Sequence, residues 1–220
     1  MTADDMQGQH PGGSALLDAM HGVLANEIQY MVLNASQLPE ELGGFEVLRE
    51  ADLDNETMAN HGFGKKTADD LAKLGRITGY VREFVVPQGA ATLEEEPAEI
   101  IMAATVIHLF ESEDAVKRWI DDSFVRDFRD NVGKESNEGQ ALQGVEILEI
   151  EGLHDYAASL LVLHEMPDAV LASTIIDFRM GNLLGVAYVV AKRDVTLSAL
   201  AKQLAVALEQ QMVRVALGAA

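Results

Sequence analysis

The C-terminal stretch, residues 173–215, constrains the fold more than any other part of the sequence. Gly181-Asn182 separates two alternating runs that are rich in β-branched residues, and glycine at the first loop position suits the type II′ turn of a hairpin. Folding about this pair places Phe178 opposite Gly185. A large residue facing a small one is typical of a covered sheet face.

An amphipathic helix is predicted directly after this hairpin, over residues 196–216. Its apolar residues recur at helical spacing and form one stripe. The stripe consists of Leu197, Leu200, Ala201, Leu204, Leu208, Met212 and Val215. We therefore expect the helix to lie on the sheet that contains the hairpin.

The overall charge excludes several partners. Sixteen basic and thirty-six acidic residues give a net charge of -20, which repels nucleic acid and anionic lipid surfaces. This acidity indicates solubility, a salt-adapted source or a cationic partner.

The 48% hydrophobic content predicts a real core. The apolar runs are too short for a membrane-spanning helix, and the lack of cysteine excludes disulfides and thiolate metal sites.

The N-terminal region is predicted to be a loose tail followed by a helix. Residues 1–13 lack periodicity and form the tail, and Ser14 is a candidate N-cap for a helix that ends near residues 34–36. The first fourteen residues lack the basic and apolar regions of a secretory signal. We expect either a cytoplasmic protein or one whose signal segment is not part of this chain.

Between these ends the sequence predicts strands and two further helices. Thr67 begins a capping box with Asp70, and Gly75 is a C-terminal stop for that helix. The predicted strands are 45–49, 77–86, 100–110, 145–150 and 157–164, and the second helix is 112–129. The chain is therefore predicted to be one α+β domain, 14–220, with antiparallel sheet, helices packed on it and an extra N-terminal helix.

The order of elements suggests an internal duplication. Residues 38–130 and 141–217 each end with a strand followed directly by a helix, and the polar loop 131–140 lies between them. One interpretation is a duplicated β-β-β-α unit whose two sheets join or face each other. The other is a coincidence of short alternating strands.

Three stretches resemble ligand-binding loops, but each lacks a feature that the loop requires. Residues 52–56 carry oxygen ligands at calcium-loop spacing, but Thr57 replaces the required glycine and Phe63 the closing glutamate. Residues 133–136 lack the first glycine of a phosphate loop, and residues 75–79 lead into a strand and not into a helix. We predict no metal site and no cofactor.

Histidines are the remaining candidates for chemistry, and no catalytic residue is assigned. His108 stands out because a strand histidine between apolar neighbours is either half-exposed or held by a hydrogen bond. No two histidines have the spacing that places them on one helix face. The others are His10, His21, His61, His154 and His164. Trp119 has the spacing of a core stripe, with a ligand platform as the alternative.

Several short motifs resemble a diffuse set of bacterial extracytoplasmic proteins. The motifs are 38–48, 75–80, Phe110 with Asp114-Ala115, and 178–182. Together they resemble LpqN-like lipoproteins, PknH-type extracellular sensor domains and, more distantly, PsbP-like proteins. The resemblance implies an α+β domain that binds or senses. The disulfide cysteines of the PknH-type sensors and the lipobox cysteine of a lipoprotein are absent from this chain, so no functional residue is carried over.

These observations favour a non-enzymatic binding or sensing domain, extracytoplasmic or at the cell surface, for an unknown small molecule or protein. A cytoplasmic location is the alternative. We expect any pocket to lie between the sheet and the helices. One rival is a hydrolase, which requires two or more of His108, His154, His164, Glu165 and Asp177 in one cleft. The other is a homo-oligomeric scaffold with an exposed apolar face on its N-terminal helix.

Overall fold

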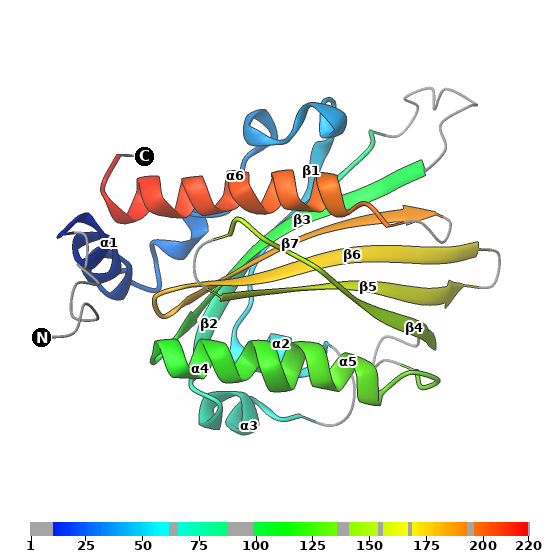
Figure 1. Ribbon diagram of the computed structural model, residues 1–220, viewed down its shortest axis with the longest axis horizontal. Helices are drawn as coiled ribbons and strands as arrows, with labels where there is room; N and C mark the ends of the chain where they lie inside the picture. Colours follow the sequence, from blue (N-terminus) through cyan, green and yellow to red (C-terminus); the bar gives the residue numbers. More distant parts are fainter. Residues whose placement is uncertain are drawn as a thin grey trace, which may run out of the picture.

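The centre of the molecule is one antiparallel sheet of seven strands, shown by a computed structural model that describes residues 11–61, 66–87, 99–135, 141–153, 156–166, 169–192 and 196–219 (Figure 1). The strand order is β1-β2-β3-β7-β6-β5-β4. The strands are β1 Glu46–Asp52, β2 Arg76–Val85, β3 Glu99–Phe110, β4 Ala141–Leu148, β5 Tyr156–Met166, β6 Ala169–Met180 and β7 Leu183–Lys192. The predicted α+β class, with antiparallel sheet and helices packed on it, is confirmed.

The C-terminal hairpin forms as its sequence predicts. Phe178 on β6 pairs with Gly185 on β7, and Ile176 pairs with Ala187. Gly181 has a φ of 59°, the positive value that the first residue of a type II′ turn requires. Helix α6, Ser198–Ala216, follows and lies along this part of the sheet.

Helices cover both faces of the sheet (Figure 1). Helix α6 packs on one face and buries its leucine stripe there. The other face carries a continuous helical segment made of α4 Glu113–Arg118, the π-helix η4 Trp119–Arg126 and α5 Asp127–Asp130. Two short helices, α2 Asn55–Ala59 and α3 Ala68–Lys73, lie on this second side.

The two proposed halves contribute unequally to the sheet. Residues 38–130 supply β1 to β3, and residues 141–217 supply β4 to β7. The two strands that precede the helices, β3 and β7, are antiparallel neighbours at the middle of the sheet. Their helices lie on opposite faces. The duplication stays a prediction.

The predicted long N-terminal helix is wrong. Helix α1, Pro11–His21, begins inside the predicted tail and ends before Gly22; short 3-10 helices then follow at Ile28–Tyr30, Ala35–Gln37 and Glu40–Leu42. The end of this segment bonds to the sheet: the Leu33 N–H donates to Thr105 Oγ1 at 3.2 Å, and Arg82 Nη1 donates to the Leu33 carbonyl at 2.9 Å. Backbone groups that bond to the sheet in this way do not take part in helical pairing.

The apolar residues of this segment are nevertheless buried. Met20, Ile28, Met31 and Leu33 join the core between the sheet and α6. The periodicity therefore identified which residues are covered but not their backbone conformation. Met20 is 1% exposed, whereas Leu24 and Tyr30, which the sequence placed on the same helix, are 61% and 62% exposed. The scaffold alternative stays a prediction.

The local signals at the other helix ends are confirmed. Thr67 caps α3 in a capping box with Asp70, and Gly75 follows its last turn with a φ of 85°. Asp54 caps α2 by accepting from the Thr57 N–H, so the acidic run 52–56 leads into a helix. No helix in the described ranges is both long and apolar enough to cross a bilayer.

The close pairing of Phe178 with Gly185 predicts the effect of Gly185→Ala. A Cβ at position 185 would lie 2.3 Å from Phe178 Cζ, and that ring is buried in the core. We expect the variant to lose about 1–3 kcal/mol of unfolding free energy, measured by urea denaturation, because overpacked cores shift or strain.

The double variant Gly185→Ala, Phe178→Leu is the control, since a smaller side chain leaves room for the added methyl group. The double variant should lose less stability than the sum of its two single variants. Strict additivity would contradict the steric account.

Candidate functional site

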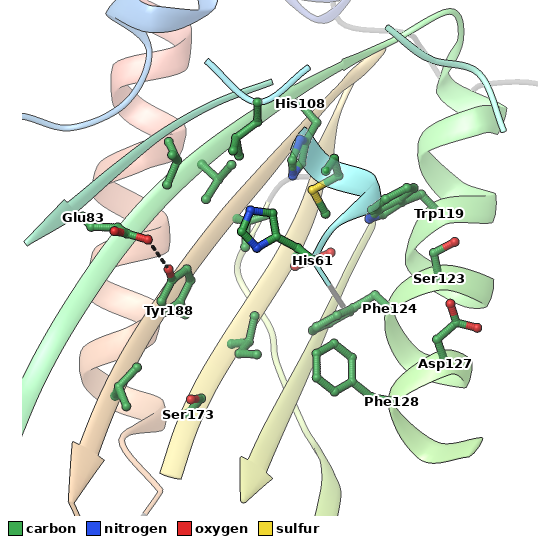
Figure 2. A pocket seen from close by; sticks show the side chains of 18 of the residues that line it. His61, Glu83, His108, Trp119, Ser123, Phe124, Asp127, Phe128, Ser173 and Tyr188 are labelled. Carbon is green, nitrogen blue, oxygen red and sulfur yellow. Dashed lines mark hydrogen bonds between the residues drawn. The ribbon is translucent and has the colours of Figure 1, made fainter. Parts of the chain in front are cut away.

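A cavity of about 920 Å³ lies between the sheet and the α4–η4–α5 helix, on the face opposite α6 (Figure 2). This volume falls in the range typical of small-molecule sites. Strands β1, β2, β3, β5, β6 and β7 all contribute to its lining, together with the helix and the α2–α3 segment. The expected position of a pocket, between sheet and helices, is confirmed.

Most of the lining is apolar. The sheet and the short helices α2 and α3 supply aliphatic side chains, and the long helix supplies three aromatic rings. The apolar lining includes Leu53, Met58, Leu71, Val81, Val106, Trp119, Phe124, Phe128, Ile175, Val186 and Val190. Trp119 is only 7% exposed, so it belongs to the core as its spacing predicts, and it also lines the pocket.

The π-helical segment sets which side chains of the helix face the pocket. Its i→i+5 bonding brings residues five apart onto the same side, and such segments often occur at functional sites. Trp119 and Phe124 are separated in this way and both are buried. In the view of Figure 2, Trp119, Ser123, Phe124 and Asp127 descend along the helix beside the sheet.

The charged side chains at the pocket are paired across elements. Arg49 Nη2 on β1 binds Glu83 Oε1 on β2 at 2.8 Å, and the Tyr188 hydroxyl lies 3.5 Å from the same oxygen. Lys66, before α3, binds the Asp127 carboxylate of the helix and lies 3.4 Å from Ser123 Oγ. These contacts connect the helix and the edge strand to the remainder of the pocket wall.

Arg76 forms a buried hydrogen-bond network behind one end of the pocket. The side chain is 2% exposed. Its Nη1 donates to Asn55 Oδ1 at 2.6 Å, while Nη2 donates to the Leu53 carbonyl at 2.7 Å and to His108 Nδ1 at 2.9 Å. Burial lowers the pKa of Arg76 to about 10, which leaves it protonated at neutral pH.

This network fixes the protonation state of His108. A guanidinium group can only donate hydrogen bonds, so His108 Nδ1 accepts and the ring proton sits on Nε2. Burial, together with the Arg76 charge, lowers the pKa of His108 well below its usual range. His108 is therefore neutral and held by a hydrogen bond, one of the two states that its sequence context predicts.

Gly79 makes room for the contact between Arg76 and His108. A Cβ at position 79 would lie 2.4 Å from His108 Nδ1 and 2.7 Å from Arg76 Nη2. Real side chains do not approach so closely, so the site requires glycine here. Gly75 and Gly79, which offered no dinucleotide site, thus have a structural role beside Arg76.

Asp177 is the buried acid of the pocket. Its side chain is 3% exposed and belongs to the lining. Within the described part of the chain its carboxyl group makes no hydrogen bond and no ion pair. Burial raises the pKa of Asp177 well above its usual range, because an ionised carboxylate loses hydration in this apolar setting.

Three of the five residues named for the hydrolase alternative line this one pocket: His108, His164 and Asp177. Glu165 is exposed and is not part of the lining, and His154 lies outside the described residues. His61, which was not favoured, also lines the pocket, whereas His21 is exposed and lies 3.3 Å from Glu113. His10 lies outside the described residues.

The strand register keeps these three groups apart. His164 pairs with Leu171, and Asp177 is six residues further along β6, a separation of roughly 20 Å. His108 lies two strands away from Asp177, with a further offset of two residues, so their Cα atoms are roughly 10 Å apart or more. Nucleophile and base chemistry needs contacts of about 3 Å.

No metal centre is found in the ranges that the structure describes. There, no three His, Asp or Glu side chains come together in a way that could hold an ion. The cavity is largely apolar, with a few fixed polar groups, and lies on one face of an antiparallel sheet.

The comparisons with known proteins identify a similar fold and no family. No protein-family model matches the chain, and no curated sequence matches it either. Among solved structures, it is similar to the extracellular domain of PknH from Mycobacterium tuberculosis, with a TM-score of 0.56 and 11% sequence identity over 86% of this chain and 96% of that one. The PknH-like fold expected from the sequence motifs is therefore found.

The Arg76 network predicts a large loss of stability in Arg76→Met. The substitution leaves the Leu53 carbonyl, Asn55 Oδ1 and His108 Nδ1 without their donor in a buried place. We expect a loss of about 3–5 kcal/mol in urea denaturation. Arg126→Met is the matched control, because that side chain is 62% exposed, and should cost at most about 1 kcal/mol. Similar losses in the two variants would contradict the network.

The buried carboxyl predicts a pH-dependent gain in Asp177→Asn. The raised pKa means that the wild-type folded state is favoured at low pH and loses stability as the pH rises through that pKa. The variant should therefore have a melting temperature several degrees above that of wild type at pH 8, since each kcal/mol of stability shifts it by about 2–4 °C. The difference should vanish near pH 4, where the wild-type carboxyl group becomes protonated in the unfolded state as well as in the folded state. Calorimetry at both pH values measures this, and a constant difference would contradict the assignment.

Proposed function

We propose that this protein is a non-enzymatic binding or sensing domain, acting outside the cytoplasm, that holds an apolar small molecule between its sheet and the α4–η4–α5 helix. The observation that carries the proposal is the cavity of about 920 Å³ at that interface. On the opposite face the equivalent space is filled by the side chains of α6. The interface on one face of the sheet is packed, whereas the interface on the other face contains a cavity. This difference supports a binding role for the cavity.

The lining supports an apolar occupant. Pockets for small molecules are mostly apolar, with a few placed polar groups that give orientation. Here the aliphatic wall of the sheet faces Trp119, Phe124 and Phe128 across the cavity. The polar groups are fixed on rigid strands, with His108 held by Arg76 and Glu83 held by Arg49.

The extracytoplasmic location is supported by the fold. The similar solved structure is an extracellular domain, and a fold of this kind is compatible with binding or sensing without catalysis. Membership of the LpqN-like or PsbP-like groups remains a proposal that rests on the sequence motifs.

The hydrolase is the second candidate, because His108, His164 and Asp177 do share one pocket. The Nε2–H of His108 is a donor and not a base, and its Nδ1 is occupied by Arg76. A general base needs a free lone pair within reach of the proton that it removes. These features favour binding over hydrolysis.

The pocket predicts saturable binding of a neutral apolar dye. Nile red should bind with enhanced fluorescence at about one site per chain. Ser173→Phe places an aromatic ring on the pocket wall. It should weaken binding at least about tenfold, because the ring fills space in which the dye would otherwise be buried.

Gln143→Phe adds the same ring at an exposed position of β4, away from the pocket, and is the matched control. It should bind the dye as wild type does. Equal binding by the Ser173→Phe variant, or no saturable binding by wild type, would contradict a ligand pocket at this interface.

A further inference from the structure

Asp177 has no partner in a pocket whose other charges are matched. In the described part of the lining, Arg49 is paired with Glu83 and Lys66 with Asp127. The residue Asp177 is 3% exposed, and its carboxyl group makes no hydrogen bond or ion pair there. A buried polar group without a partner is costly, and a native structure that keeps one calls for an explanation.

The neighbours of Asp177 do not supply a counter-ion. The facing residues in the strand register are Ala158 and Val186, and Ile175 lies two residues away on the same face. The next residue on that face, Arg179, has its guanidinium 5.8 Å from the centre of the Tyr156 ring. The paired residues and Ile175 are therefore apolar, and the one charged neighbour named on this face, Arg179, lies against the Tyr156 ring.

We propose that the pocket binds an apolar molecule carrying a protonated amine, and that the amine pairs with the carboxylate of Asp177. This inference rests on the proposed binding function and names the class of its ligand. An ammonium group supplies both the opposite charge and the hydrogen-bond donors that the carboxylate lacks. The apolar lining around it receives the remainder of the molecule.

Two further features of the pocket suit a cation. Aromatic faces attract cations, and Trp119, Phe124, Phe128 and Tyr188 all line the cavity. The net charge of -20 raises the local concentration of cationic ligands around the protein.

His108 adds a second point of recognition. Its Nε2–H is fixed in place by the Arg76 bond to Nδ1, and the residue lines the pocket. His108 and Asp177 lie on different strands. One ligand can therefore contact both only if several bonds separate its amine from its hydrogen-bond acceptor. A hydroxyl or carbonyl oxygen in the apolar part of the amine fits this donor.

The test compares three probes that share a ten-carbon chain and differ in head group: decylammonium, decanol and decanoate. Trp119 is the only tryptophan in the chain and lines the pocket, so its fluorescence reports occupancy directly. We expect decylammonium to bind at least about tenfold more tightly than decanol, and decanoate to bind most weakly.

Asp177→Asn removes the charge with little change of shape. It should lower the affinity for decylammonium at least about tenfold while leaving that for decanol within about threefold. Glu165→Gln is the matched control, because it removes one negative charge from an exposed position outside the pocket. It should leave both affinities unchanged, which separates pairing with Asp177 from attraction by the net charge.

The outcomes separate this inference from the proposed function. If the three probes bind equally, or if Asp177→Asn leaves decylammonium binding intact, the amine assignment is overturned while the pocket stands. If none of the probes changes Trp119 fluorescence and Nile red also fails to bind, the binding function itself is overturned. The comparison of head groups on wild type needs no variant, and equal binding of the three probes overturns the amine assignment even if Asp177→Asn does not fold.

Discussion

The guanidinium of Arg76 is the interaction on which this side of the structure depends. It is buried and protonated, and its two Nη atoms donate only to neutral acceptors on Leu53, Asn55 and His108. Its buried Nε has no hydrogen-bond partner among the described residues. Burying such a charge is costly unless several hydrogen bonds hold it. Gly79 permits the approach, and the Leu53 N–H donates back to the Gly79 carbonyl at 2.8 Å. The network thus joins α2, β2 and β3 and determines how His108 faces the pocket.

The sheet divides the molecule into two unlike layers. Toward α6, small residues such as Ala201, Ala205 and Gly185 let the helix and Phe178 pack closely. Toward α4–η4–α5, the rings of Trp119 and Phe124 pack in two separate apolar clusters, and Lys66, before α3, pairs with Asp127 of the helix. The first layer is closely packed. In the second layer the side chains of the helix and the sheet do not fill the space between them, and a cavity remains.

A pocket of this kind is a compromise between stability and binding. The carboxyl group of Asp177 is placed where an apolar side chain would stabilise the fold more. Polar groups held in this way on rigid strands are preorganised, so a ligand that matches them binds without first ordering the protein. Sites where local rules of folding are broken are where function is expected.

The sequence by itself determined the α+β class, the hairpin about Gly181, the register of Phe178 on Gly185 and the cap at Thr67, because each of these depends on neighbours in the chain. It also identified His108 as a residue to inspect. It could not find Arg76, whose partners lie up to 32 residues away and whose only local signal is Gly75 before it and Gly79 three residues after it. Nor could it show that the first helix ends at His21 and that the Leu33 backbone bonds to Thr105 and Arg82. The cavity, and the lone position of Asp177 within it, were decided by tertiary packing alone, since they depend on how a helix and a sheet fail to fill the space between them.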